Sequence, residues 1–272
     1  MSKTILITGA TDGIGFETAK RLAAAGHTLL IHGRSQAKLE DRQAQLQTID
    51  GAGTIACFRA DLSRLAEVDA LAAEVSAQHT QLDALINNAG VFKLAGNTTQ
   101  DGLDLRFLVN TLAPYRLTQL LLPLMGPEGR IVNLSSAAQA PVDLQALAGQ
   151  RSLGDGKAYA QSKLAITMWS FHLAAQLGAA GPAVIAVNPA SFLASKMVKD
   201  AYGVAGNDLS IGADILVRAA LDAEFADASG RYYDNDSRRF AQPHPDALDA
   251  AKNARLVATL DALLDQGRAS TT

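Results

Sequence analysis

The sequence predicts an α/β fold with a doubly wound parallel sheet, built as a single domain over residues 1–272. Short apolar runs alternate with longer amphipathic stretches along the chain, and this alternation is typical of parallel sheets covered by helices. A glycine-rich turn directly follows the first apolar run, as in nucleotide-binding α/β folds. With 272 residues, 48% of them hydrophobic, the chain is also large enough to bury one extensive core.

Seven strands are expected in chain order. Most are short, continuous runs of aliphatic residues, the pattern of strands that are buried on both faces of a sheet. They are expected at Thr4–Thr8, Thr28–His32, Thr54–Arg59, Leu82–Ile86, Gly129–Leu134, Val184–Val187 and Arg231–Tyr233.

The stretches between these strands predict the covering helices. The last helix has leucines at the spacing that packs one helical face onto the body. Helices are expected at Phe16–Ala25, Gln36–Gln47, from near Ser63, at Asp104–Met125, from near Lys157, at Leu209–Leu221 and within Pro245–Leu264. Two connections, at about 137–156 and 189–207, are long for plain loops, and we expect both to border a substrate.

Composition excludes several classes of function. The net charge of −3 and a pI near 5.9 indicate no basic surface for nucleic acid or an anionic membrane. Leu164 to Ser195 contains no charged residue, but glycines and prolines interrupt it, so we expect a helix and a strand rather than a membrane span. The N-terminus has no signal-peptide pattern, and the single Cys57 excludes an internal disulfide, so a cytoplasmic location is expected. The five histidines are scattered, so no metal site is expected.

The glycine-rich turn is the first candidate binding site. Its glycines follow the spacing G-x-x-x-G-x-G between the first strand and the first helix. Glycine lets the backbone approach a diphosphate, and the N-terminus of a helix favours an anion. The spacing differs from the commoner dinucleotide fingerprint, and any tight turn can need glycine for its own geometry. We expect cofactor contacts from Gly9, Thr11, Asp12, Gly13, Ile14 and Gly15.

The residue after the second strand should select the nucleotide. In doubly wound sheets an acidic side chain there binds the 2′-hydroxyl of the adenosine ribose. This sequence has Gly33-Arg34 instead, and a guanidinium suits a 2′-phosphate, so we expect NADP, with NAD less favoured. Two readings oppose this: Arg34 could be a solvated loop cation, and the charge of Asp12 could repel the phosphate.

Three other positions carry polar residues where the pattern is apolar. Asp61, followed by Leu62, could accept from the adenine amino group or cap the helix that begins near Ser63. Asn87-Asn88-Ala89-Gly90 ends the fourth strand, either as an ordinary turn or as buried amides that lock neighbouring strands and shape a cofactor floor. Asn110 lies among apolar residues, so it must find a partner, in the core or in a site.

Tyr159 and Lys163 are the candidate catalytic pair. They are four positions apart on one predicted helix and should therefore lie on the same face, one turn apart. A free phenol has a pKa of about 10, and a neighbouring ammonium lowers it, which makes a better acid and base near neutral pH. The spacing alone is weak evidence, because chance produces such a pair in roughly one chain in six. Ser136 follows the fifth strand, at the edge of the sheet where ligands bind.

In combination these motifs resemble those of the short-chain dehydrogenase/reductase family. The order matches from Thr8 to about Ser195: glycine turn, Asn-Asn-Ala-Gly, serine after the fifth strand, then tyrosine and lysine on the next helix. The resemblance implies a Rossmann-type seven-stranded sheet and an NAD(P)-dependent enzyme that acts on CH–OH or C=O groups. It implies the catalytic residues Asn110, Ser136, Tyr159 and Lys163. It also implies cofactor contacts at Asn88, Ala89, Gly90, Tyr159, Lys163 and Pro189.

Two departures from the family pattern bear on the substrate. The gap from Ser136 to Tyr159 is longer than in many compact members and resembles that of the retinol-dehydrogenase-like reductases, so an enlarged loop is expected. The family's Pro-Gly after the sixth strand is Pro189-Ala190 here, and Ser195 stands where a threonine is expected. The second departure bears on the path of the loop beside the nicotinamide.

The resemblance also implies a role for each catalytic residue. Tyr159 would donate the proton in reduction and accept it in oxidation, and Lys163 would hold the nicotinamide ribose. Ser136 would bind the substrate oxygen, and Asn110 would hold a water between Lys163 and solvent. Val91, Phe92, Leu153, Phe192 and Tyr202 could form an apolar pocket for a lipophilic carbonyl or alcohol, or each could simply pack in the core.

One alternative of a different class is a non-catalytic NADP-binding regulator or scaffold. Such proteins commonly lose the tyrosine or the lysine, and this chain has both, so the enzyme is the favoured interpretation. The expected partner is a small carbonyl or alcohol, without nucleic acid or membrane. Pairing of two copies into a homo-oligomer is compatible with the family.

Overall fold

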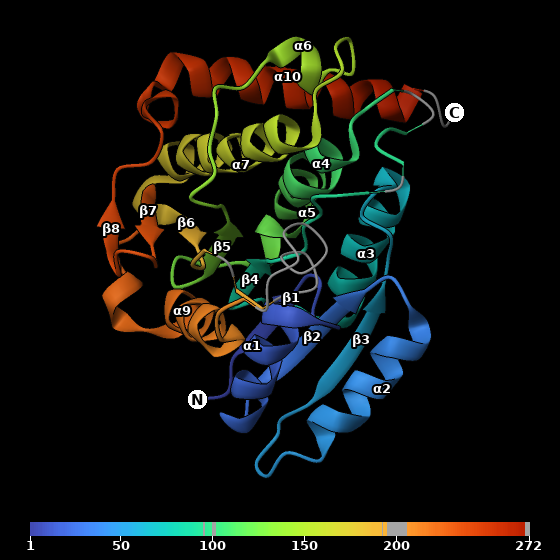
Figure 1. The fold of residues 1–272 in the computed structure, drawn as a ribbon. Helices are drawn as coiled ribbons and strands as arrows, with labels where there is room; N and C mark the ends of the chain where they lie inside the picture. Colours follow the sequence, from blue (N-terminus) through green and yellow to red (C-terminus); the bar gives the residue numbers. More distant parts are fainter. Residues whose placement is uncertain (95, 100–101, 192, 195–205, 270–272) are drawn as a thin grey trace.

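Eight strands form one sheet at the centre of the protein, in the order β3-β2-β1-β4-β5-β6-β7-β8 (Figure 1). The computed structural model describes residues 1–94, 96–99, 102–191, 193–194 and 206–269. The strands are β1 (Thr4–Ile7), β2 (Thr28–Gly33), β3 (Ile55–Arg59), β4 (Ala84–Asn87), β5 (Arg130–Leu134), β6 (Ala183–Asn188), β7 (Arg231–Asp234) and β8 (Arg239–Ala241).

The first seven strands are parallel, as the sequence predicts. β1 pairs with β2 on one side and with β4 on the other, so the strand order reverses there and leaves a crevice at the carboxyl ends of the strands. The eighth strand was not predicted, and it runs antiparallel to β7. It has only three residues, beginning at Arg239, which is too short for a periodic pattern to indicate a strand.

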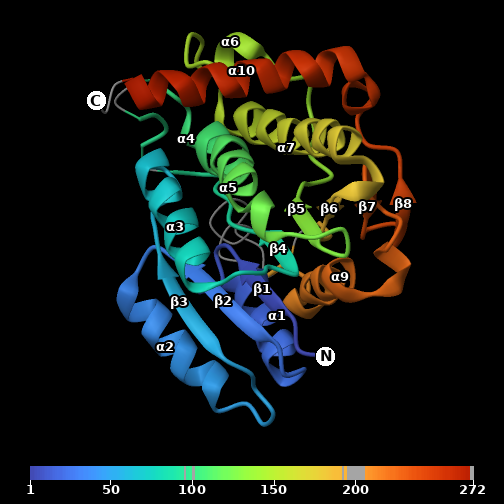
Figure 2. The same cartoon turned by 180° about the vertical axis from the view of Figure 1, so that it is seen from behind.

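Helices cover both faces of the sheet (Figures 1 and 2). Side chains of β1 alternate between the faces: Leu6 belongs to the core under α3, α5 and α7, whereas Ile5 and Ile7 belong to the core under α1, α2 and α9. α10 packs on the outside of α7, as the leucine spacing of the tail predicts. The helices are α1 (Gly13–Ala24), α2 (Gln36–Gln47), α3 (Leu65–Gln78), α4 (Leu105–Phe107), α5 (Ala113–Leu121), α6 (Leu144–Leu147), α7 (Asp155–Leu177), α9 (Leu209–Leu221) and α10 (Ala250–Ala269).

The helix expected over Asp104–Met125 is interrupted. A π-helical turn at Leu108–Leu112 separates α4 from α5, and a 3-10 turn follows α5. Pro114 explains the first interruption, because it has no N–H to donate to the carbonyl of Asn110 four residues earlier. The prediction of a single helix was therefore wrong in detail, and Pro114 was the signal that could have corrected it.

The segment without charged residues forms most of α7 and then β6, as predicted. Gly178, with a φ of 56°, ends α7. Among the described residues no helix is both long enough and apolar enough to cross a membrane. Cys57 lies on β3, half-buried.

The two expected substrate loops differ in how far the structure describes them. The segment 137–156 contains α6 and the first residues of α7, which begins at Asp155 rather than near Lys157. In the segment 189–207, positions 192 and 195–205 lie outside the described residues. The expectations for Phe192, Ser195 and Tyr202 therefore lie outside them as well.

Candidate active site

The glycine turn joins β1 to α1 at the crevice. Gly9 and Gly13 have φ values of 66° and 54°, which glycine adopts at little cost. A Cβ on Gly15 would lie 2.3 Å from the carbonyl oxygen of Gly9, so this position also requires glycine. Asp12 caps α1 by accepting from the Gly13 amide at 2.8 Å. The amides of Ile14 and Gly15 donate to no atom of the described residues, so they are available to an anion.

The asparagines after β4 build the floor below this turn. Asn88 Nδ2 donates to the carbonyl oxygens of Thr8 and Gly9, at 2.8 and 3.1 Å. Asn87 is buried and donates to Asn133 on β5 at 2.8 Å. Of the two interpretations left open by the sequence, the structure therefore supports the second: Asn87 locks neighbouring strands, and Asn88 fixes the turn.

His32 supports the same turn from β2, and nothing in the sequence pattern except its position on a strand indicated this role. Its Nδ1 accepts from the Gly9 amide at 3.2 Å, so the ring proton is on Nε2, which donates to the carbonyl of Ala60 at 3.0 Å. Burial lowers the pKa of His32 to about 4, so the ring is neutral. His32 also lines the cavity and is thus part of the site.

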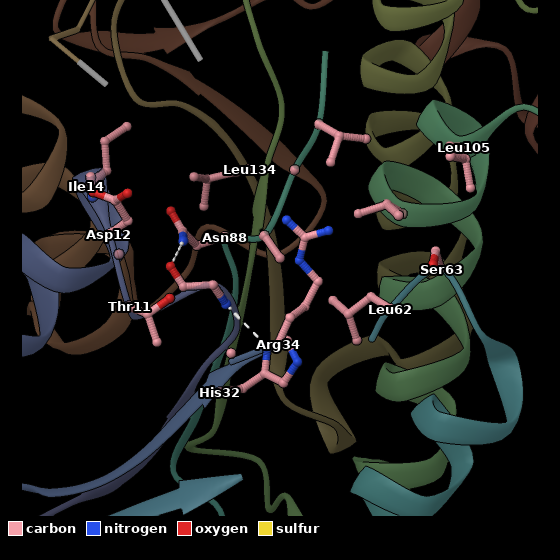
Figure 3. A pocket seen from close by; sticks show the side chains of 18 of the residues that line it. Thr11, Asp12, Ile14, His32, Arg34, Leu62, Ser63, Asn88, Leu105 and Leu134 are labelled. Atoms are coloured by element: carbon pink, nitrogen blue, oxygen red, sulfur yellow. Dashed lines mark hydrogen bonds between the residues drawn. The ribbon is translucent and has the colours of Figure 1, made fainter. Parts of the chain in front are cut away.

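Arg34 and Asp61 lie where β2 and β3 end. The Arg34 guanidinium makes no hydrogen bond or ion pair with the described residues, and it extends into the cavity shown in Figure 3. Asp61 accepts from both the amide and the hydroxyl of Ser63, at 3.0 and 2.8 Å. Burial would raise the pKa of Asp61, but these hydrogen bonds and the charges of Arg34 and Arg64 together outweigh it and lower that pKa. Asp61 therefore stabilises the turn before α3; the expected helix cap is wrong, since α3 begins at Leu65 after Arg64.

Asn110 lies in the π-helical turn and is 1% exposed. Its Oδ1 accepts from the Val91 amide at 2.8 Å, and its Nδ2 donates to the Val91 carbonyl at 2.9 Å and to Ser162 Oγ at 3.0 Å. The side chain therefore joins the segment after β4 to α7. The expected water at Asn110 stays a prediction.

Tyr159 and Lys163 lie one turn apart on α7, as their spacing predicts. Lys163 Nζ is 5.7 Å from the centre of the Tyr159 ring and donates to the Leu134 carbonyl at 2.7 Å. The Tyr159 ring packs against Phe92, with 4.7 Å between ring centres. Burial lowers the pKa of Lys163 to about 8.

The two serines after β5 have different environments. Ser135 is buried, and its hydroxyl contacts Thr167 and the Lys163 carbonyl on α7. Ser136 is half-buried; its Oγ accepts from the Ala138 amide at 3.1 Å, and its carbonyl accepts from Tyr232 and from Gln139. Because Ser136 Oγ uses only its acceptor capacity here, its own hydrogen is available to another oxygen.

The backbone after β6 is strained at Ala190, where the family pattern has glycine. Its φ of 111° lies outside the conformations that residues with a Cβ adopt readily. The neighbouring Pro189 accepts from Asn235 through its carbonyl at 3.0 Å.

One cavity of about 350 Å³ joins these elements (Figure 3). All fifteen residues predicted to contact the cofactor line it, from Gly9 in the first turn to Pro189 after β6. Two of the four expected catalytic residues, Ser136 and Asn110, are not among its lining residues. Val91 lines it, but Phe92 and Leu153 do not; Leu153 packs against the core instead. Further lining residues that the sequence did not predict are His32, Gly33, Ser63, Leu94, Leu105, Val109, Leu134 and Ser135.

The cavity fits a dinucleotide. The amides of Ile14 and Gly15 lie in the glycine turn, and the guanidinium of Arg34 lies at the end of β2. The ammonium of Lys163 and the phenol of Tyr159 lie on α7. Amides and a guanidinium bind phosphates, and the cavity continues past them to groups that can transfer a proton. Among the described residues no group of His, Cys, Asp and Glu could hold a metal ion.

Comparison with known proteins agrees with this geometry. A family model described as short chain dehydrogenase matches residues 3–203. The chain belongs to this family. It is therefore a short-chain dehydrogenase/reductase, an oxidoreductase that uses NAD or NADP and acts on CH–OH or C=O groups.

Curated relatives assign the chain to the retinol-dehydrogenase-like branch. It is 31% identical to retinol dehydrogenase 13 of Homo sapiens over 281 residues, which cover 94% of this chain and 84% of the relative. It is 32% identical to retinol dehydrogenase 12 of Mus musculus, over 87% of this chain and 78% of that protein. Polyprenol dehydrogenase of Homo sapiens is 29% identical, over 86% of this chain and 77% of that protein.

Solved structures have the same fold. An uncharacterised protein from Mycobacterium paratuberculosis superposes with a TM-score of 0.79 at 28% identity, covering 96% of this chain and 92% of that one. The reductase LugOII, described as promiscuous and as catalysing keto-reduction at C1 during lugdunomycin biosynthesis, superposes with a TM-score of 0.67 at 27% identity. That match covers 86% of this chain and 96% of LugOII.

Proposed function

We propose that this short-chain dehydrogenase/reductase uses NADP to interconvert a lipophilic carbonyl compound and its alcohol, with Tyr159 as the proton donor and acceptor. The observation that carries the proposal is the position of Tyr159 and Lys163 on the wall of the same cavity that Arg34 enters from β2.

The preference for NADP rests on the end of β2. Arg34 is near enough to Asp61 to help lower the pKa of that carboxyl, but it forms no ion pair or hydrogen bond with the described residues, so its guanidinium donors are available to a 2′-phosphate. Asp12, whose charge opposes that phosphate, accepts from the Gly13 amide as the cap of α1. Gly33, the preceding residue, has no side chain that could accept from a ribose hydroxyl.

The chemistry divides between the cofactor and the protein. When bound, the nicotinamide supplies or accepts the hydride. Tyr159 gives its phenolic proton to the substrate oxygen in reduction and takes it back in oxidation. Ser136 donates its free hydroxyl hydrogen to the same oxygen and so stabilises the charge that develops there.

Lys163 acts on the tyrosine and on the ribose. Its ammonium, 5.7 Å from the Tyr159 ring centre, favours the ionised phenol electrostatically. In the structure described here it donates to Leu134, and the three donors of an ammonium leave two for ribose hydroxyls. Asn110 contributes by fixing the backbone of Val91, which lines the cavity.

The substrate class follows from the apolar part of the cavity and from the relatives. The aliphatic side chains that line it include Val91, Leu94, Leu105, Val109 and Leu134. Such walls favour an apolar substrate over a polar one. Several relatives are named for long apolar alcohols, retinol and polyprenol, which supports the same class here. With NADP as cofactor we expect reduction to be the direction in the cell.

The proposal is tested by a substrate panel read through NADPH absorbance. We expect turnover of apolar aldehydes such as decanal, with kcat/KM about tenfold or more above that of the polar glyceraldehyde. NADPH should outperform NADH on the same substrate. Tight NADPH binding without turnover of any aldehyde, ketone or alcohol would instead favour a regulator. The cytoplasmic location and a homo-oligomeric state stay predictions.

A further inference from the structure

Arg106 is a fully buried arginine beside the active site that takes part in no step described above. Its side chain is 0% exposed and contacts two carboxylates, those of Asp104 and Asp155. Its Nη1 also lies 3.5 Å from the carbonyl oxygen of Phe92. A buried guanidinium needs one opposite charge, and this one has two, which raises the question of what the second one does.

Asp104 alone satisfies the charge of Arg106. It accepts from Nε at 2.8 Å and from Nη2 at 2.6 Å, a bidentate pair, and it also accepts from the Arg106 amide. The hydrogen bonds with Asp104 are the largest cause that raises the pKa of Arg106 above its ordinary value, and the one with Asp155 adds to it. Because the two residues are only two positions apart, this pair holds together a single short segment. The contact with Asp155 is therefore not needed for charge balance.

Asp155 joins that segment to the catalytic helix. It is the first residue of α7, one turn before Tyr159, and its Oδ1 accepts from Arg106 Nη1 and, at 3.2 Å, from Asn97 Nδ2. Asn97 in turn accepts from the Leu105 amide through its carbonyl at 2.8 Å. One carboxylate oxygen thus connects the start of α7 with two parts of the segment after β4.

The same segment forms part of the wall opposite Tyr159. Val91 and Leu94 line the cavity, and Phe92 packs against the Tyr159 ring. Two contacts from the first turns of α7 therefore fix the position of the phenol relative to this wall: the ring contact of Tyr159 with Phe92, and the carboxylate of Asp155 with Arg106 and Asn97. Small displacements of a catalytic group reduce rates strongly.

We propose that Asp155 is a positioning residue. Through Arg106 and Asn97 it holds α7, and with it Tyr159, in a fixed position relative to the segment after β4 that lines the cavity. This inference rests on the proposed role of Tyr159. Asp104 keeps the charge of Arg106 neutralised. Removal of the Asp155 charge should therefore let Tyr159 shift relative to the segment after β4, while the buried arginine stays paired with Asp104.

The test compares Asp155→Asn with Asp69→Asn. Asp69 is a matched control, because its side chain is 41% exposed against 39% for Asp155, and it also pairs with a mostly buried arginine, Arg116, away from the cavity. We expect Asp155→Asn to lower kcat roughly ten- to hundredfold while the Kd for NADPH changes by less than about twofold. Asp69→Asn should lower the Tm by a comparable amount and leave kcat unchanged.

The result that overturns the inference is an equal kcat for the two variants, or a parallel loss of kcat and NADPH affinity in Asp155→Asn. If Asp155→Asn does not fold, Asn97→Ala decides the matter, since Asn97 is exposed: a fall in kcat of about twofold or more supports the inference, and an unchanged kcat overturns it. Failure of the proposed function would appear separately, as turnover that survives Tyr159→Phe.

Discussion

The two halves of the cavity are built differently. At the ends of β1 to β4 the walls consist of backbone and short side chains, such as Gly9, Gly15 and Asn88, held by hydrogen bonds between neighbouring strands. On the side of β5, β6 and α7 the proposed catalytic groups are long side chains, Tyr159 and Lys163, which contact Phe92 and the Leu134 carbonyl. The nucleotide half is thus fixed by backbone geometry and hydrogen bonds between strands, and the catalytic half by the packing of side chains.

Removing Arg34 tests whether the nucleotide half selects NADP. We expect Arg34→Ala to weaken NADPH binding by roughly ten- to a hundredfold, since hydrogen bonds to a charged partner contribute about 1.5–3 kcal/mol. NADH binding should not change, because it has no 2′-phosphate.

Arg239→Ala is the control for the Arg34 experiment, since Arg239 is an exposed arginine on β8 at the other edge of the sheet. Titration of nicotinamide fluorescence measures the Kd values. Equal effects of the two substitutions on NADPH would show that Arg34 contributes only general charge.

The pH dependence of cofactor binding tests whether Lys163, in the catalytic half, also holds the cofactor ribose. Burial lowers the pKa of Lys163 from 10.5 to about 8, so its charge is lost as the pH rises through that value. If the ammonium holds the ribose, the Kd for NADPH should be about tenfold higher at pH 9 than at pH 7. Between pH 8 and 10.5 this group makes the free energy of unfolding rise with pH, because the unfolded state binds more protons.

Lys157→Ala, an exposed lysine on the same helix, should retain this pH dependence, whereas Lys163→Met should bind weakly at every pH. A Kd for the unmodified protein that stays constant from pH 7 to 9 would contradict the account of Lys163.

Replacement of Ala190, in the catalytic half, is expected to have the smallest effect, a change in the thermal stability of the protein. Replacement by glycine should remove backbone strain of about 1–3 kcal/mol against an entropic cost of about 0.5–1 kcal/mol. We expect the net change to raise the Tm by roughly 2–4 °C. Arg238→Gly is the comparison, because its φ of 55° is in the milder left-handed region, and it should gain less than Ala190→Gly with its φ of 111°. If calorimetry shows a larger gain in Tm for Arg238→Gly than for Ala190→Gly, backbone strain does not explain the effect of Ala190→Gly.

Much of the fold could be predicted because its signals are local. Most of the seven parallel strands were short apolar runs, and the helices Gln36–Gln47 and Leu209–Leu221 agree with the structure at both ends. β8 carries no such run, and the interruption at Leu108–Leu112 depends on a proline whose effect falls four residues earlier.

The same distinction applies to the site. Glycine spacing, strand ends and the resemblance to the family indicated the expected cofactor residues, and the structure brings all of them to one cavity. His32 and Asp155 could not be found in this way, since their partners at Gly9 and Arg106 are distant in the sequence and meet only in the folded chain. The retained hydrogen of Ser136 likewise depends on the turn to Ala138.

The most direct test of the central claim is the turnover of Tyr159→Phe, measured together with its Kd for NADPH. The substitution removes one hydroxyl group and retains the ring that packs against Phe92. The account predicts that kcat falls about a thousandfold or more, and that the Kd for NADPH stays within about threefold of the unmodified protein. A variant that retains more than about a tenth of the original kcat would contradict the assignment of Tyr159 as the proton donor.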